Sequence, residues 1–513
     1  MKINLKKFNQ RPLFGADKML QRLPELSGYM QICKDVIFPK ILDSDYEDLY
    51  KEGGRPPVSP RVLMCVTILQ FLERLPDRSA ASNLIYRLDW KIAMGLEVDD
   101  PGFSHQLLSV WRGRLIENDV AKRIFDQLIE ELKERGLVRK NGKQRIDSTH
   151  VLADLKELSR VELMTETLRL GSKDLQSLGL ELPSWVSNII SSYEDTIKLY
   201  QISQEERLRI LTKAGSDMLS LTTFIKDYLS SEVLTKNIKT LISVFEQNFV
   251  VDSNCNQPEL IKVATGKDHI CSPHDPEARF GSKHHNIGYK AQIVETAERE
   301  QTNFIVDVES EDNEETDQGK VAEALTRLES QDLVPETLYA DAGYISGEAI
   351  ADANEREVNV LGPLADKGEF VGENFSYNQK TDEYTCMAGK KSMSCHEETN
   401  GSKIYRFSIS DCKNCPFLNE CRPRRKKNTK NQEGRMVRHS PYHEEIADRK
   451  KLMRTDAFKE DMKNRNAIEG TISAMKRGAG FARCRYKGKK KFRIQLIFSA
   501  IAFNIKRLNV ALA

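Results

Sequence analysis

Residues 464–476, NRNAIEGTISAMK, predict a helix that carries three charged side chains on one narrow stripe. At about 100° per residue, Arg465, Glu469 and Lys476 lie at roughly 0°, 40° and 20° around the helix axis. One interpretation is a solvated helix face, on which Arg465 and Glu469 form an ion pair at the i,i+4 spacing. The other is that Glu469 faces a metal ion while the flanking cations face phosphates, which requires partner carboxylates elsewhere in the chain.

Two aspartates on predicted strands are the candidate partners. Residues 144–151, QRIDSTHV, follow an Asn-Gly turn and predict a strand that carries Asp147. Residues 337–344, TLYADAGY, predict a strand that brings Asp341 to its end. Either aspartate alone has an ordinary explanation, as a strand-end cap or a turn residue. Converging carboxylates instead hold hard divalent cations, and two such ions about 4 Å apart support phosphoryl transfer.

The segments around these aspartates predict an α/β sheet. Residues 285–294 and 303–308 predict strands that can pair antiparallel, a helix follows near residues 317–330, and residues 358–361 predict one more strand. Ligands of α/β sheets gather at the carboxyl ends of strands. We therefore expect Asp341 at such an end, with the first aspartate reaching the same edge.

Long helical patterns lie on both sides of the first predicted strand. Before it, residues 58–136 predict a cluster of capped helices, in which Ser59 and Pro60 begin the first helix. After it, residues 155–250 show a long helical periodicity that predicts a helical insertion.

The third helix of the first cluster is basic, because it carries His105, Arg112 and Arg114. A compact three-helix cluster with such a last helix fits a helix-turn-helix DNA reader, with Arg112 and Arg114 contacting DNA. A plain helical domain with a solvated face fits the same residues equally well.

Length and composition set the broad class. With 513 residues, the chain is long enough for two to four domains. The hydrophobic share of 39%, the charged share of 30% and the lack of a run of about 18 apolar residues argue against a membrane span. The first residues lack the apolar segment of a secretory signal, and the ten cysteines are spread as in a reduced cytosolic protein. We therefore expect a cytoplasmic location.

Charge is uneven along the chain although the net charge is only +2. Residues 307–317 are acidic, whereas residues 422–439 and 476–493 are strongly basic. We expect both basic runs to hold DNA phosphates rather than to read bases. A helix predicted over residues 492–508 should pack on the sheet and hold the second run beside the active site. The side chains of this run that we expect to bind DNA are Arg483, Arg485, Lys489, Lys490 and Lys491, together with Arg465 and Lys476 of the glutamate helix.

A polar segment before Glu469 contains five cysteines: Cys386, Cys395, Cys412, Cys415 and Cys421. The Cys412-x2-Cys415 spacing is typical of zinc ligands, and Cys386 and Cys421 would complete a tetrahedral site. Cys395 is then one cysteine too many. A structural Zn²⁺ and free thiols both remain open interpretations.

These stretches resemble one family over most of the chain, the DDE transposases of bacterial insertion sequences, which have a ribonuclease-H-like catalytic core. The family's glutamate motif is Arg, three residues, Glu, six residues, Lys, and residues 465–476 fit it. That motif often begins with a tyrosine three positions before the arginine, where this chain has Met462. The other stretches that carry the resemblance are residues 54–96 for the N-terminal helical domain, RIDSTHV (145–151) and TLYADAGYIS (337–346) for the two aspartate strands, and residues 275–295 for the hairpin between them.

The resemblance implies four parts of the chain. It implies a helical N-terminal DNA-binding domain in residues 1–138 and the first part of the catalytic core in residues 139–370, with the helical insertion at about residues 152–260. A cysteine-rich and basic insertion would occupy residues 371–440, and the rest of the core, with the glutamate helix, residues 441–513.

The resemblance also implies the chemistry. Asp147, Asp341 and Glu469 would hold Mg²⁺ or Mn²⁺, two ions in all, and cleave and transfer the terminal inverted repeats of the element. The partner would be double-stranded DNA, the assembly a homodimer on that DNA, and the location the bacterial nucleoid. Two alternatives stay open: a non-catalytic repressor derived from a transposase, and a ribonuclease-H-like nuclease that only hydrolyses.

Overall fold

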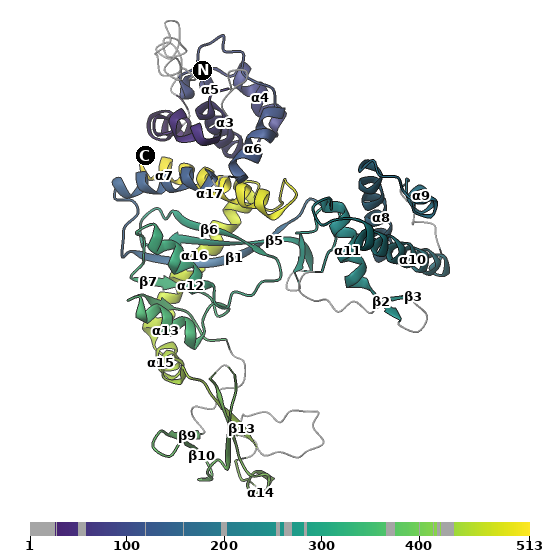
Figure 1. Cartoon of the computed structure of the whole chain (residues 1–513). Coiled ribbons are helices and arrows are strands. Elements are labelled where there is room, and N and C mark those ends of the chain that lie inside the picture. The colour runs from purple at the N-terminus through teal and green to yellow at the C-terminus, as the bar shows by residue number, and fades with distance from the viewer. Residues whose placement is uncertain are drawn as a thin grey trace.

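A central six-stranded sheet of mixed direction organises the fold (Figure 1). The computed structural model describes residues 26, 28–49, 58–117, 120–156, 158–195, 203–252, 257–260, 269–281, 285–365, 375–399, 401–413, 415–417, 421 and 435–513. In space, β6 and β4 pair with the outer edge of β5, followed by β1, β7 and β8. These strands are β1 (Lys143–Leu152), β4 (Arg279–Gly281), β5 (Asn286–Thr296), β6 (Ile305–Asp312), β7 (Thr337–Tyr339) and β8 (Asn359–Leu361).

Strand β1 lies at the centre of the sheet and carries Asp147. It runs antiparallel to β5, with Asp147 opposite Ile293, and parallel to β7. Because side chains alternate along a strand, Ile146 enters the main hydrophobic core while Asp147 lies on the opposite face. On that second face, Tyr339 packs against Phe458 of helix α16 (Asp456–Gly478), the helix that carries Glu469.

The predicted α/β sheet is confirmed, with differences at its ends. Strand β7 ends at Tyr339, so Asp341 lies in the turn that follows rather than on the strand. Strand β4 was not predicted, because three residues are too few to show a period. Helices α12 (Lys320–Ser330) and α13 (Gly347–Glu355) connect β6 to β7 and β7 to β8.

The N-terminal helices form where their caps predict them. Ser59 begins the first long helix, since its hydroxyl accepts a hydrogen bond from the Val62 amide. Gly136 follows the last one with a φ of 69°, the left-handed conformation that glycine adopts at helix ends. The helices are α2 (Gly28–Ile32), α3 (Pro60–Leu72), α4 (Asp77–Tyr86), α5 (Leu88–Met94), α6 (Gln106–Glu117) and α7 (Val120–Glu134), with short turns η2 (Cys33–Ile37), η3 (Phe38–Lys40) and η4 (Asp43–Leu49) after α2.

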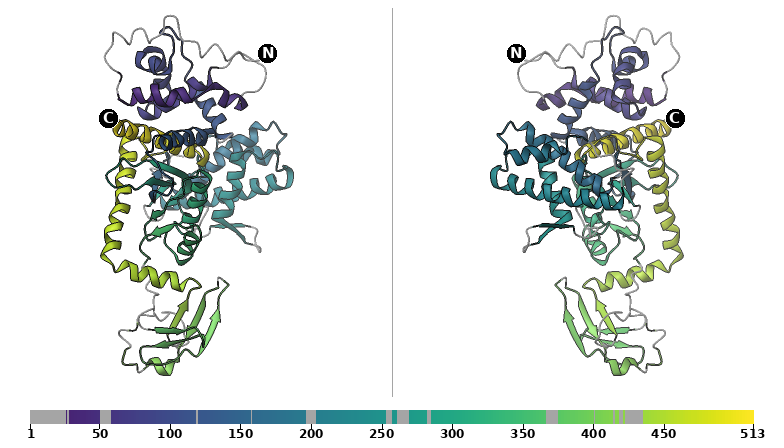
Figure 2. Two further views of the ribbon diagram at one scale, coloured as in Figure 1. Left: turned by 90° about the vertical axis from the view of Figure 1, so that its left-hand side faces the viewer. Right: turned by 90° about the vertical axis from the view of Figure 1, so that its right-hand side faces the viewer.

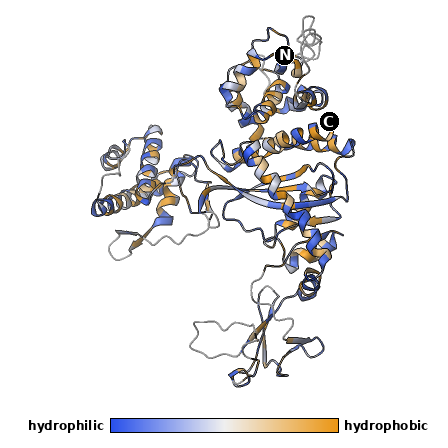
Figure 3. Cartoon of the chain, turned by 180° about the vertical axis from the view of Figure 1, so that it is seen from behind, coloured by the Kyte–Doolittle hydropathy of each residue, from blue (hydrophilic) through white to orange (hydrophobic). Residues whose placement is uncertain are grey.

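The last helix, α17 (Lys489–Ala511), lies between these helices and the sheet (Figure 1). It is largely apolar along its length (Figure 3). Phe498 stacks on Phe71 of α3 at 5.4 Å between ring centroids, and Asn504 bonds both the amide and the carbonyl of Ile305 on β6. The N-terminal helices and the sheet therefore share one continuous core.

The helical segment between β1 and β5 has a hydrophobic core of its own. Close packing within it shows at Gly171, where a Cβ would lie 3.2 Å from the nearest Leu241 side-chain atom. A hairpin, which the helical periodicity did not predict, follows the last helix. The elements are α8 (Arg160–Ser177), α9 (Ser184–Ser191), α10 (Gln204–Tyr228), α11 (Lys236–Asn248), β2 (Phe249–Asp252) and β3 (Gln257–Leu260).

A small module of strands lies far from the N-terminal helices (Figure 2). Its core contains Phe375, Tyr384, Tyr405, Phe407 and Val437. Helix α15 (His443–Met453) connects it to α16. The module consists of β9 (Phe375–Asn378), β10 (Glu383–Cys386), β11 (Ser394–Glu397), β12 (Lys403–Arg406), α14 (Ile409–Lys413) and β13 (Met436–His439). None of the helices described has the length and apolar content that a membrane span needs.

Candidate active site

Three carboxylates from three separate elements converge on one guanidinium. Arg465 Nη2 lies 3.0 Å from Asp147 Oδ2 and 3.7 Å from Asp341 Oδ2. Arg465 Nη1 lies 2.8 Å from Glu469 Oε1, one helical turn along α16. Asp147 and Arg465 are 318 positions apart in sequence, so only the fold brings them together.

The two aspartates are oriented by backbone amides, and the glutamate projects toward solvent. Asp147 Oδ1 accepts a hydrogen bond of 2.8 Å from the Ser148 amide. Asp341 Oδ1 accepts one of 2.8 Å from the Gly343 amide in the turn after β7. Glu469 projects from α16 with 66% of its side chain exposed, so it closes the group from the solvent side.

Burial changes the chemistry of Asp147. Desolvation raises the pKa of Asp147 to about 6, against the lowering effects of Arg465 and of the Ser148 amide. The neighbouring carboxylate of Asp341 adds to the rise. Burial and nearby like charges both destabilise the ionised form of a carboxylate. A cation placed between these acids would stabilise the ionised form of Asp147.

The donor set fits a hard divalent cation, because it consists of carboxylate oxygens from three elements. In the conformation described, no group of three or more His, Cys, Asp or Glu side chains among the described residues is arranged to hold a metal ion. The guanidinium of Arg465 lies among the three acids instead.

A buried ionic network attaches the glutamate helix to the sheet. Glu295 of β5 is fully buried, and its two carboxylate oxygens accept hydrogen bonds from Arg145, Arg507 and Thr471. Thr471 is two residues from Glu469, and Arg145 also donates to the Asn464 carbonyl at 2.8 Å. The network therefore fixes α16 against the strand that carries Asp147.

An open cleft of about 710 Å³ adjoins the acids. Ser148 and Gly343, the neighbours of two of the acids, line it together with Lys476 of α16. Burial lowers the pKa of Lys476. A cation of the glutamate helix and the chain neighbours of two of the acids thus line the same cleft.

Comparisons with protein families identify two parts of the chain. The family model described as "Transposase DDE domain" matches residues 385–509, a stretch that includes Glu469 but neither aspartate. The model described as "Transposase domain (DUF772)" matches residues 23–114, the N-terminal helices. Together the two matches support a DDE transposase of the insertion-sequence type. The search of curated proteins and the search of solved structures find no match.

Several basic side chains that were predicted to bind DNA have partners within the fold. Arg112 is buried, donates to both oxygens of Asp77 at 2.9 and 2.5 Å, and lies 4.8 Å from the ring centre of Tyr486. Arg485 donates to the Leu75 carbonyl. Both guanidinium groups thus have partners within the fold, where they join the N-terminal helices to the segment before α17.

The second basic run also differs from its prediction. Lys489, Lys490 and Lys491 form the first turn of α17 rather than a loop before it, because acidic side chains hold this end. Glu277 accepts the Lys489 amide at 2.6 Å, and Lys489 Nζ lies 3.1 Å from Asp312. Lys490 and Lys491 are exposed.

The remaining predicted DNA contacts differ in exposure. Arg114 is half-buried on α6, and Arg483 is exposed with its guanidinium 3.0 Å from Asp154. Lys476 faces the cleft. Of the first basic run, residues 422–434 lie outside the described residues.

Four of the five cysteines line the same cavity, although among the described residues no three of them are arranged to hold a metal ion. Cys386, Cys412, Cys415 and Cys421 all line one cavity of about 30 Å³, with Phe375 and Phe407 at its wall. Burial raises the pKa of Cys421, and the other three thiols add to the rise. Cys395 lies on β11, is exposed, and is not among the cavity residues.

Sequence reasoning missed a polar network beside the acids. Asp317 contacts both Ser148, the residue after Asp147, and Lys290. Asp317 ends the acidic run 307–317, so the run was visible in the sequence. Its place at the site was not, because its contacts join segments 169 positions apart.

Proposed function

We propose that this transposase binds the terminal inverted repeats of its insertion sequence and catalyses metal-dependent DNA cleavage and strand transfer. The observation that carries the proposal is the convergence of Asp147, Asp341 and Glu469 on the single guanidinium of Arg465. In this proposal the sheet β6-β5-β1-β7-β8 is the ribonuclease-H-like core. DDE transposase domains generally depend on divalent metals, which supports the assignment.

In the proposed mechanism the three carboxylates would hold Mg²⁺ or Mn²⁺. Two such ions supply an activated water or 3′-hydroxyl and stabilise the leaving oxygen in phosphoryl transfer. The chain's own contribution is positioning and electrostatics. Lys476, in the cleft beside the acids, is placed to hold a phosphate of the DNA.

The first test removes one carboxylate at a time. Mg²⁺-dependent cleavage of terminal-repeat DNA should be abolished in each of the variants Asp147→Asn, Asp341→Asn and Glu469→Gln. Each change removes a metal ligand, and the proposed site has no covalent step that could replace the metal. DNA affinity, measured by gel shift in the same preparations, should stay close to wild type. Asp332→Asn is the matched control, since Asp332 pairs with Lys140 in an exposed ion pair. Cleavage by Asp341→Asn at the wild-type rate would contradict the assignment.

The same assay separates the alternatives. A repressor derived from a transposase would bind the repeats without cleaving them, and the convergence of all three acids speaks against it. A nuclease that only hydrolyses would release cut ends without joining them to target DNA. Joined products on a supplied target plasmid would support strand transfer.

We also infer that the four cysteines of the strand module hold a structural Zn²⁺. Their placement around one small cavity supports this assignment, and thiolates are preferred zinc ligands. Metal analysis of purified transposase should find about one zinc per chain, and a Cys412→Ser, Cys415→Ser variant should lose it. A Cys395→Ser control should keep the metal. Pure, active and zinc-free protein would refute the site.

A further inference from the structure

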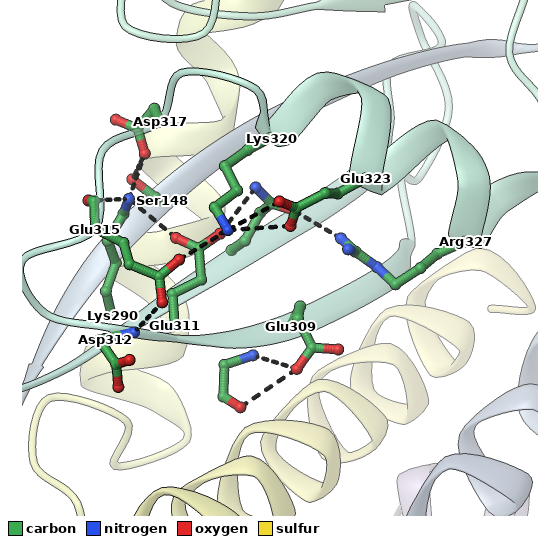
Figure 4. Close-up of polar contacts among 12 residues, drawn as sticks. Ser148, Lys290, Glu309, Glu311, Asp312, Glu315, Asp317, Lys320, Glu323 and Arg327 are labelled. Carbon is green, nitrogen blue, oxygen red and sulfur yellow. Dashed lines mark hydrogen bonds and ion pairs between the residues drawn. The ribbon is translucent and has the colours of Figure 1, made fainter. Parts of the chain in front are cut away.

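A fourth carboxylate, Asp317, lies beside the proposed catalytic acids. It belongs to the turn between β6 and α12 (Figure 4). It lines the same cleft as Lys476. Asp317 Oδ1 accepts a hydrogen bond of 3.0 Å from the Ser148 hydroxyl. The same oxygen lies 2.6 Å from Lys290 Nζ.

Lys290 fixes the position of Asp317. Its side chain is only 3% exposed, and it lies 2.9 Å from Glu311 Oε2 as well as close to Asp317. It also donates a hydrogen bond of 2.9 Å to the Glu315 carbonyl. A buried cation with three partners has little freedom to move, so the carboxylate of Asp317 is held in one place.

The contacts continue from Asp317 to the catalytic acid. The Ser148 hydroxyl bonds Asp317, and the Ser148 amide bonds Asp147 Oδ1 at 2.8 Å. One residue of β1 thus connects the two carboxylates. Ser148 is thus held at its hydroxyl by Asp317, while its amide bonds Asp147.

Gly343 gives a second indication that Asp317 belongs to the site. A Cβ added at Gly343 would lie 3.1 Å from Asp341 Oδ1 and 3.2 Å from Asp317 Oδ2. The two carboxylates therefore approach the same glycine from different elements. Any larger residue at this position would crowd both of them.

We propose that Asp317 is a positioning residue of this active site, which orients Asp147 for metal binding through the hydroxyl of Ser148. The proposal rests on the metal-dependent function proposed above. Groups that hydrogen-bond a metal ligand or its neighbours typically change metal affinity about 10–100-fold when they are removed. In this proposal Lys290 holds Asp317 in place, and Ser148 connects Asp317 to Asp147.

The test measures metal binding to the full chain without DNA. Free Mn²⁺ is followed by electron paramagnetic resonance during titration of the wild type and of the variants Asp317→Ala, Ser148→Ala, the double variant, Ser148→Thr, Asp147→Asn and Asp332→Ala. Asp317→Ala and Ser148→Ala should each weaken Mn²⁺ binding about 10–100-fold. The double variant should bind no more weakly than either single variant, because both changes break the same connection. Ser148→Thr keeps the hydroxyl and should bind as wild type, and Asp332→Ala should show no change.

Three outcomes would overturn the proposal. Wild-type Mn²⁺ affinity in Asp317→Ala and Ser148→Ala, combined with loss of binding in Asp147→Asn, would remove Asp317 from the site and leave the proposed function intact. Additive losses in the double variant would show that Asp317 does not act through Ser148. Unchanged binding in Asp147→Asn would refute the metal centre itself, and this inference with it. Should Asp317→Ala fail to fold, the Ser148→Ala and Ser148→Thr pair still decides the question.

Discussion

Arg465 is the residue on which the proposed site depends most. Three carboxylates that lie close together repel one another, and a guanidinium among them offsets that repulsion. With 13% of its side chain exposed, Arg465 is also partly removed from water, so its contacts with the acids are screened less than surface pairs. A divalent cation bound by the same oxygens would compete with this side chain.

Replacing Arg465 should therefore change metal binding and catalysis in opposite directions. Arg465→Gln should bind Mn²⁺ about tenfold more tightly, because a competing cation is lost from among the ligands. The same variant should cleave terminal-repeat DNA more slowly, since a phosphate-facing cation is lost as well. Titration of Mn²⁺ and single-turnover cleavage measure the two effects. Arg356→Gln, which disrupts contacts with Glu329, Asp352 and Thr326, is the control.

Equal or weaker Mn²⁺ binding in Arg465→Gln would mean that the guanidinium supports the acids rather than competing with the metal.

The sequence predicted that Arg465 and Glu469 lie on one helical stripe and can form an ion pair, and this pair is confirmed at 2.8 Å. The contacts of Arg465 with Asp147 and Asp341 needed the tertiary fold, as did the position of Asp317.

At the scale of elements, sequence periodicity and capping residues predicted which helices and strands form. The exact ends of several elements could not be predicted in this way. Strand β1 and helix α3 begin within a residue or two of their predicted starts, because a turn signal and a serine cap fix them. Helix α17 begins earlier than predicted, at Lys489. Its first turn is stabilised by Glu277 and Asp312, which come from segments far away in sequence. No local pattern could show these partners.

The buried network at Glu295 should stabilise the packing of α16 and α17 on the sheet. Arg507→Met should lower the free energy of unfolding by about 2–3 kcal/mol, because it removes a charged partner from a fully buried carboxylate. Chemical denaturation of the full chain measures this loss. Arg356→Met is the matched control in a more exposed pair and should cost less than about 1 kcal/mol. Equal losses in the two variants would mean that the network does not hold the helix.

At the scale of the whole molecule, the DNA path we propose runs from the cleft to the start of α17. Lys476 lines the cleft, and Lys490 and Lys491 are exposed at the helix start. The acidic run 307–317 lies beside the same end of α17, as the ion pair between Lys489 and Asp312 shows. The sequence predicted that the basic run 476–493 holds DNA, but the fold pairs one of its lysines, Lys489, with Asp312 of the acidic run.

This difference predicts unequal effects of neighbouring lysines. A Lys490→Ala, Lys491→Ala variant should reduce the salt dependence of DNA binding by about 1.8 in log–log slope, equally for terminal-repeat and random DNA. Lys489→Ala should change the slope much less, because Lys489 pairs with Asp312. Fluorescence anisotropy over a range of salt concentrations measures the slopes. An unchanged slope in the double variant would mean that the lysines are only solvated, and a loss confined to terminal-repeat DNA would mean that they read sequence.

Helix α17 fixes the position of the N-terminal helices relative to the sheet. The helices that match a transposase domain and the sheet that carries Asp147 pack on its two sides and share one core. A hinge between them would have to break that core. If the N-terminal helices grip the end of the element, α17 acts as a ruler: the spacing between the gripped sequence and the cut phosphate is set by protein packing rather than by the DNA, and each copy of the element is cut at the same distance from its recognised end.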